Sequence, residues 1–165
     1  MTLREYDPGA ILAVLVERRV DFVLIGGLAA ISHGSPFPTE DVDVTPERSR
    51  HNLDRLSDAL RELGARIRAD GIDDGLPFEH DGASLAAADV WNLVTDRGDL
   101  DISMVPSGTD GYADLLTDSA GTEIMGVGVR VASLADVIRS KQAANRPKDQ
   151  RVLPTLRELL DRRRG

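Results

Sequence analysis

The chain has 165 residues, a formal net charge of −8 and no cysteine. These values fit a single domain over residues 1–165, exclude disulfides and thiolate catalysis, and argue against broad, nonspecific binding to nucleic acid, which depends on neutralising phosphates. No run approaches the ~20 apolar residues of a membrane helix, and no signal-peptide pattern is seen, so we expect a cytoplasmic protein without a membrane partner.

The first part of the chain predicts a helix, a buried strand and a second strand. Asp7-Pro8 is typical of a helix start. Phe22 to Ile25 is continuously apolar, which predicts a central strand buried on both faces. The glycine pair Gly26-Gly27 predicts a turn into a short helix over residues 28–33. Residues 41–45 predict the second strand.

The next part predicts a longer helix, a strand and a loop. Pro46 suits the first turn of a helix, and Gly64 suits its end. Residues 65–68 predict a strand. Residues 70–82 are rich in Gly and Asp, which predicts a mobile loop, with a position beside the functional site as one interpretation.

The last part predicts a hairpin, a strand and two helices. Residues 91–95 and 99–104 alternate as hairpin strands. Residues 123–131 predict one strand that glycines weaken. Ser133 predicts a helix N-cap, and residues 148–163 predict a final helix. The order of elements indicates an α/β (α+β) fold, a small mixed β-sheet flanked by helices.

Two aspartates in the second predicted strand carry the strongest functional signal. Asp41 and Asp43 are separated by Val42, so both carboxylates lie on one face of the strand. Two negative charges this close favour a divalent cation. Asp101 lies between Leu100 and Ile102, and it can add a third carboxylate if the two strands are neighbours. Asp99 is the rival third acid. Three such carboxylates can hold two Mg²⁺ ions, or Mn²⁺, for phosphoryl displacement.

The glycine pair suggests a phosphate site. Gly26 and Gly27 allow a backbone to approach phosphate oxygens closely, and the following helix directs free N–H groups toward an anion. Ser32 or Ser35 can add a hydroxyl donor. A tight strand-to-helix turn is the alternative interpretation of the glycines.

The order of these motifs resembles the nucleotidyltransferase superfamily, which is related to DNA polymerase beta. The family motif is a hydrophobic residue and a glycine pair, then Asp-hydrophobic-Asp, then a third acid on a later strand. Here it reads Ile25-Gly26-Gly27, thirteen residues, Asp41-Val42-Asp43, and later Asp101. The resemblance implies the nucleotidyltransferase fold and a two-metal site of Asp41, Asp43 and Asp101.

Within that superfamily the chain is similar to the AbiEii-type group, which includes toxins of toxin–antitoxin systems. The similarity extends to Ser140-Lys141 and to the segment 146–149. The resemblance implies active-site roles for Lys141 and for the Lys-Asp pair that ends in Asp149. Lys141 also extends an apolar helix face, so snorkelling to the surface is an alternative. Asp149 can pair with Lys141, act as a base or cap a helix.

Thr39 lies just before the acids and can hydrogen-bond near them. Phe37 occupies a position where the AbiEii-type group often carries an arginine, so one phosphate contact is missing. Larger members of the group also add a C-terminal helical domain.

The combined prediction is a magnesium-dependent nucleotidyltransferase that moves NMP from an NTP to an acceptor. The acceptor is RNA such as tRNA, a protein or a small molecule, and a cognate antitoxin is a further expected partner. A small-molecule acceptor is expected to require a second substrate-binding domain or a dimer. The alternative is a noncatalytic, nucleotide-binding or antitoxin-like module of the same fold.

Overall fold

A computed structural model describes residues 5–164. One eight-stranded mixed sheet runs through it, in the order β4-β3-β5-β6-β2-β1-β8-β7. The pairs β1–β8 and β2–β6 are parallel, and the other neighbours are antiparallel. The strands are β1 (Phe22–Ile25), β2 (Asp41–Pro46), β3 (Arg66–Ala69), β4 (Ile72–Leu76), β5 (Val90–Thr95), β6 (Gly98–Ser103), β7 (Ala120–Ile124) and β8 (Val127–Val131).

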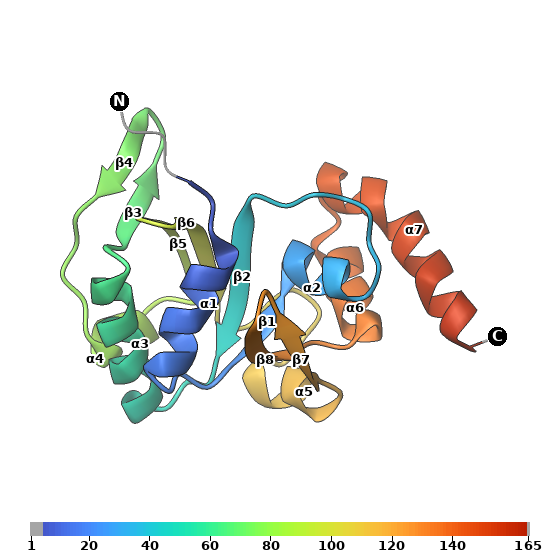
Figure 1. The fold of residues 1–165 in the computed structure, drawn as a ribbon, viewed down its shortest axis with the longest axis horizontal. Coiled ribbons are helices and arrows are strands. Elements are labelled where there is room, and N and C mark those ends of the chain that lie inside the picture. The colour runs from blue at the N-terminus through green and yellow to red at the C-terminus, as the bar shows by residue number, and fades with distance from the viewer. Residues whose placement is uncertain (1–4, 165) are drawn as a thin grey trace.

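Helices flank this sheet in two groups (Figure 1). The helices α3 and α4 lie beside the β3–β4 half, and α2, α6 and α7 lie toward the β1–β8 half. The helices are α1 (Pro8–Glu17), α2 (Gly26–Ser32), α3 (Arg50–Glu62), α4 (Gly82–Ala86), α5 (Tyr112–Thr117), α6 (Leu134–Ala144) and α7 (Pro147–Arg164). The expected fold class, a mixed sheet flanked by helices, is therefore confirmed.

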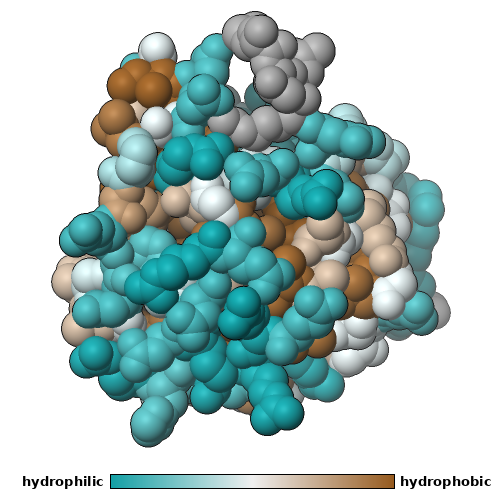
Figure 2. All heavy atoms as spheres, turned by 60° about the vertical axis from the view of Figure 1, so that its left-hand side comes forward, coloured by the Kyte–Doolittle hydropathy of each residue, from teal (hydrophilic) through white to brown (hydrophobic). Residues whose placement is uncertain are grey.

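The apolar periodicity of the sequence accounts for the core. Val23 and Leu24 are fully buried, as expected for a central strand. In α3, the leucines at helical spacing, such as Leu53 and Leu60, are buried. The side of the molecule turned forward in Figure 2 is covered mainly by hydrophilic residues.

No helix among residues 5–164 is both long and apolar enough to cross a membrane.

Three expectations about the boundaries of elements were wrong. Pro46 ends β2 rather than opening a helix, and the Ser49 side chain caps α3 by accepting a hydrogen bond from the Asn52 N–H. The helix expected from residue 28 begins at Gly26, directly after β1. The strand expected over residues 123–131 is a hairpin instead, because the chain reverses at Met125 and Gly126, both with positive φ.

The segment 70–82 also differs from the expected mobile loop. It forms β4, which pairs with β3, and then reaches the start of α4. Asp81 and Ser84 form a capping box at that start. None of residues 70–82 lines the cavity described below, so the position beside the site is also wrong. The short helices α4 and α5 had no expected counterpart.

Candidate active site

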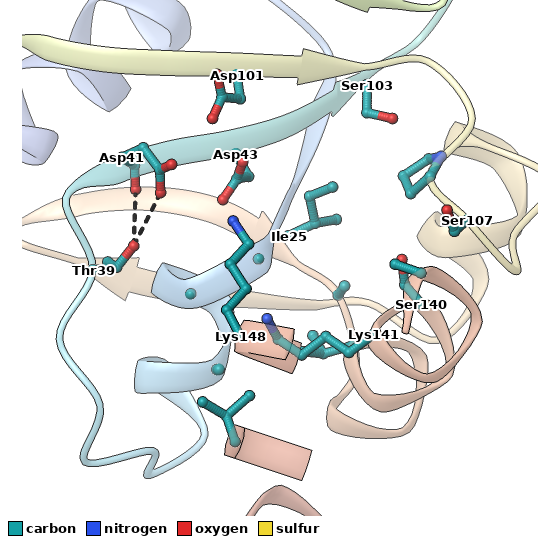
Figure 3. A pocket seen from close by; sticks show the side chains of 18 of the residues that line it. Ile25, Thr39, Asp41, Asp43, Asp101, Ser103, Ser107, Ser140, Lys141 and Lys148 are labelled. Carbon is teal, nitrogen blue, oxygen red and sulfur yellow. Dashed lines mark hydrogen bonds between the residues drawn. The ribbon is translucent and has the colours of Figure 1, made fainter. Parts of the chain in front are cut away.

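Strand alternation brings the three predicted aspartates together. Because β2 and β6 are parallel neighbours, Asp43 lies beside Asp101 and Asp41 lies beside Asp99. Val42 and Leu100, which alternate with the acids, are fully buried on the opposite face. Figure 3 shows the carboxylates of Asp41, Asp43 and Asp101 facing the same cavity.

The three carboxylates form a donor set that suits a divalent cation. One oxygen from each of Asp41, Asp43 and Asp101 lies within 4.8 Å of the other two. Oδ1 of Asp101 is buried and accepts no hydrogen bond from the residues described. Convergent carboxylate oxygens with a free lone pair are the ligands that Mg²⁺ and Mn²⁺ prefer. The residues present therefore fit the metal site that the sequence predicts.

Burial and mutual repulsion make this cluster difficult to ionise. Burial raises the pKa of the Asp43 carboxyl to about 7, and the Asp41 and Asp101 carboxylates act in the same direction. The ammonium groups of Lys148 and Lys141 oppose this rise in pKa. Burial also raises the pKa of Asp101, to about 6. A bound divalent cation would relieve the repulsion, which is the electrostatic argument for a metal.

The glycine pair is explained by close packing against the acids. Gly26 has φ +71°, and a Cβ atom there would collide with the Asp43 carboxylate. A Cβ atom at Gly27 would lie 2.7 Å from Oγ1 of Thr39. Both glycines also line the cavity. Their lack of a side chain is what allows Asp43 and Thr39 to sit against the start of α2.

Polar neighbours hold the acids in place. The Thr39 hydroxyl donates to Oδ1 of Asp41 at 3.1 Å, as the sequence suggested for this threonine. The Tyr6 hydroxyl donates to the backbone carbonyl of Asp41 at 3.0 Å. Ser35 is buried at the cavity wall, where its hydroxyl oxygen accepts a hydrogen bond from the Phe37 N–H at 3.3 Å. Phe37 itself also lines the cavity.

Two lysines face the acids across the cavity. The side chain of Lys148, on α7, extends toward Asp43, and that of Lys141, on α6, reaches into the same cavity (Figure 3). Lys141 lies 3.6 Å from Oδ1 of Asp149, which is fully buried. Asp149 also accepts hydrogen bonds from the backbone N–H and the side chain of Arg146, at 3.1 and 2.8 Å. The structure therefore brings Asp149 to Lys141, at the first turn of α7.

The charge of Asp149 depends on these partners. Burial alone would raise its pKa, but the hydrogen bonds from Arg146 and the charge of Lys141 outweigh burial and lower the pKa. The ionised carboxylate fixes the direction of Lys141, whose side chain is 16% exposed. This buried ion pair explains why a lysine sits on an otherwise apolar helix face.

The other end of the cavity is rich in hydroxyl groups. Ser103, Ser107 and Ser140 line it, and none of their hydroxyls hydrogen-bonds to another residue in the range 5–164 (Figure 3). Asp136 also lines this end, where its carboxylate pairs with Arg139 at 3.1 Å. The whole cavity measures about 510 Å³, which is in the range of small-molecule sites.

Several neighbours of the acids were not among the predicted site residues. Arg68, on β3, lies 3.0 Å from Oδ1 of Asp101. The Tyr6 hydroxyl bonds to the backbone of Asp41. Lys148 also faces the cluster, and the resemblance had implied an active-site role for it as part of the Lys-Asp pair. The alternation Arg66-Ile67-Arg68 was a usable signal for a polar strand face. That alternation does not predict the strand order, which is what places Arg68 beside Asp101.

Comparison with known proteins identifies the fold. No family model and no curated protein matches the sequence. Among solved structures, the lincosamide antibiotic adenylyltransferase LnuA, bound to lincomycin, superposes with a TM-score of 0.60 at 13% identity. The match covers 92% of this chain and 95% of LnuA.

Two further structures give similar superpositions. ANT(2'')-Ia in complex with adenylyl-2''-tobramycin has a TM-score of 0.53 at 18% identity, covering 96% of this chain and 97% of that one. A candidate nucleotidyltransferase from Thermotoga maritima has a TM-score of 0.52 at 18% identity, covering 94% and 91%. With the strand order and the acid pair that follows the glycine turn, these likenesses show that the chain has the nucleotidyltransferase fold.

Proposed function

We propose that the protein is a magnesium-dependent nucleotidyltransferase, which transfers NMP from an NTP to an acceptor hydroxyl and releases pyrophosphate. The observation that carries this proposal is the convergence of Asp41, Asp43 and Asp101 opposite Lys141 and Lys148 in one cavity. Three acids facing two lysines suit a ligand with several phosphate groups. Some of its phosphate oxygens can bind cations held by the acids, and others can bind the lysines. A nucleoside triphosphate with its divalent cations is such a ligand.

Each part of the cavity has a role in this proposal. Asp41, Asp43 and Asp101 would hold two Mg²⁺ ions, which neutralise the triphosphate and polarise the reacting oxygens. Lys141 and Lys148 bind the β- and γ-phosphates, and the backbone at Gly26 and Gly27 approaches the same phosphates, with the Ser35 hydroxyl at the same wall. Asp149 orients Lys141. Thr39 holds Asp41 in position.

The side of approach of the acceptor follows from the in-line geometry of phosphoryl transfer. The glycine turn and the lysines hold the triphosphate on the β1 side of the acids, so the attacking hydroxyl comes from the β6 side, where Asp101 lies. The acceptor oxygen forms a bond to the α-phosphorus as the bond to the bridging oxygen breaks. Pyrophosphate leaves, and the hydroxyl proton passes to Asp101.

The hydroxyl-rich end of the cavity suits the nucleoside. Ser103, Ser107 and Ser140 offer uncommitted hydroxyls that can hydrogen-bond to a ribose or a base. The triphosphate is placed at the opposite end of the cavity, because Lys148 and the glycine turn lie there beside the three acids. An NTP in this orientation would extend from the glycine turn to the serines, and the acceptor would approach from the β6 side, where Asp101 lies.

A small hydroxylated molecule is the acceptor class that we place first. LnuA and ANT(2'')-Ia, which are of similar length to this chain, are described with lincomycin and with adenylyl-2''-tobramycin. From the sequence, we expected a small acceptor to require a second substrate-binding domain or a dimer. Because chains of this size are described with small-molecule ligands, we favour the dimer over a second domain. The net charge of −8 also disfavours a long RNA. The similarity to AbiEii-type toxins keeps tRNA and protein as acceptors to be tested, together with a toxin–antitoxin role.

The experiment is a transfer assay with α-labelled NTPs. The purified protein is incubated with Mg²⁺, each NTP in turn, and three acceptor pools: hydroxylated small molecules, tRNA and protein. We expect label to enter one pool, and we expect Asp43→Ala to abolish the transfer. Absence of transfer to every pool, without Mg²⁺-dependent NTP binding, would rule out the enzyme. Binding without transfer would instead support the noncatalytic, nucleotide-binding alternative.

A further inference from the structure

A guanidinium group already occupies one side of the third carboxylate. Nη2 of Arg68 lies 3.0 Å from Oδ1 of Asp101 and 3.4 Å from Oδ2 of Asp99. The same nitrogen donates to the backbone carbonyl of Leu93 at 3.1 Å. Arg68 therefore places a positive charge directly beside one carboxylate of the proposed metal site.

The contact between Arg68 and Asp101 is an ion pair without hydrogen-bond geometry. Although the two groups are close, no N–H of Arg68 is directed at Oδ1 of Asp101. Nε of Arg68 is buried and has no partner among the residues described. An incompletely satisfied guanidinium is a group whose hydrogen bonds can improve if it shifts.

The positive charge of Arg68 competes with a cation at Asp101. Arginine stays protonated in proteins, so it cannot remove the conflict by losing its charge. A guanidinium and a divalent cation on the same carboxylate repel each other strongly at such a short distance. Cation binding at Asp101 is therefore weakened as long as Arg68 stays on this carboxylate.

Asp99 is positioned to receive the released guanidinium. It lies two residues before Asp101 on the same face of β6, and it already contacts the same nitrogen of Arg68. Asp99 does not belong to the three-carboxylate cluster. The side chain of Asp99 is 42% exposed, so pairing with a guanidinium costs Asp99 less hydration than it costs the more buried Asp101. A small rotation of Arg68 exchanges one carboxylate for the other.

We propose that Arg68 is a built-in counter-cation of the metal site, which pairs with Asp101 when no divalent cation is bound and moves to Asp99 when one binds. This inference rests on the proposed function, because it concerns the same carboxylates. Arg68 is then a positioning residue that sets how tightly Asp101 takes a cation. Asp99, the rival third acid, has the separate role of accepting Arg68.

The test is a double-mutant cycle that measures Mn²⁺ affinity, with free Mn²⁺ counted by electron paramagnetic resonance. We expect Arg68→Gln to lower the dissociation constant about fivefold, because the competing charge is gone. We expect Asp99→Asn to raise the constant by a similar factor, because Arg68 then stays on Asp101. In the Arg68→Gln background, Asp99→Asn should change the affinity by less than about twofold.

A matched control separates this effect from net charge. Arg66 lies on the same strand, and its ion pair is with Asp96, outside the cluster. Arg66→Gln removes the same charge, and we expect it to leave Mn²⁺ affinity nearly unchanged. Weaker or equal binding by Arg68→Gln, or equal effects of Asp99→Asn in both backgrounds, would overturn the proposed exchange.

The same data distinguish this inference from the proposed function. If Mn²⁺ binds the wild-type protein and Asp43→Asn equally, or neither of them, the metal site and the proposed function both fail. If binding depends on Asp43 but the cycle shows no coupling between Arg68 and Asp99, only the role of Arg68 fails.

Discussion

At the scale of single residues, the acidic cluster is electrostatically costly in the folded protein. Asp43 and Asp101 are held close to Asp41 and away from water, and the pKa of each is raised. Such a loss of stability is typical of sites where the charged groups bind a ligand. This conflict supports a cation site more strongly than the presence of acids alone.

The first prediction concerns the pH dependence of stability. The native pKa of Asp43, about 7, lies above its ordinary value of 3.8. Its ionisation therefore lowers the free energy of unfolding, an effect that is absent below about pH 4 and complete above pH 7. We expect Asp43→Asn to be as stable as wild type near pH 4 and more stable by about 1–3 kcal/mol at pH 8. Urea unfolding in EDTA measures the difference.

The control for that prediction is Asp161→Asn, which removes an exposed acid of α7. We expect its stability relative to wild type to vary little between pH 4 and pH 8. Added Mg²⁺ should stabilise wild type more at pH 8 than at pH 5, and should stabilise Asp43→Asn less. An Asp43→Asn protein that is no more stable than wild type at pH 8 would contradict the electrostatic cost.

The second prediction concerns Lys148, the lysine of α7 that extends toward Asp43. Lys148 lies at the cavity and opposes the raised pKa of Asp43. We expect Lys148→Met to raise the dissociation constant of an NTP by about tenfold, which is the usual strength of one charged hydrogen bond. Arg151→Met, on the same helix but away from the cavity, is the matched control. Equal effects of the two substitutions would argue against a direct phosphate contact.

At the scale of elements, the junction between β1 and α2 positions the acids of the site. The start of α2 packs against the Asp43 carboxylate and Thr39, and this packing leaves no room for a Cβ atom at Gly26 or Gly27. The glycine pair therefore shapes the acid cluster as well as the cavity wall.

The third prediction separates this close packing from backbone strain. Gly26 (φ +71°) and Gly126 (φ +83°) both have left-handed backbones, but only Gly26 has atoms where a Cβ would be placed. We expect Gly126→Ala to destabilise the protein by about 1–2 kcal/mol through backbone strain alone. Gly26→Ala should cost roughly 3 kcal/mol or more and should also weaken Mn²⁺ binding. Equal losses in the two variants, with Mn²⁺ binding intact, would disprove the packing role.

The elements also show what the sequence can predict. The alternation around Asp41, Asp43 and Asp101 is local, so it correctly indicated three acids on one face, and β2–β6 pairing then brought them together. The hairpin of β7 and β8 was missed because Met125, a residue without turn preference, adopts a positive φ. Arg68 was missed because its place beside Asp101 depends on the order β3-β5-β6, which is a long-range property.

At the scale of the whole molecule, charge is distributed unevenly. The net charge is −8, and the cavity places Lys141, Lys148 and Arg146 opposite the acids Asp41, Asp43 and Asp101. A local cationic wall in an acidic protein favours a compact anion such as a triphosphate over a long polyanion, which the rest of the surface repels. Together with the nucleotidyltransferase fold, this distribution supports an NTP as the ligand of the cavity.

Calorimetric titration with a nonhydrolysable NTP analogue, with and without Mg²⁺, tests whether the three acids bind an NTP through a cation. Wild type and Asp161→Asn are predicted to bind the analogue at least about tenfold more tightly when Mg²⁺ is present, because cations link the triphosphate to the three acids. Asp43→Asn is predicted to lose that dependence on Mg²⁺. The proposed metal-dependent NTP site would be contradicted if the analogue did not bind. It would also be contradicted if the affinity were the same with and without Mg²⁺ and in wild type and Asp43→Asn.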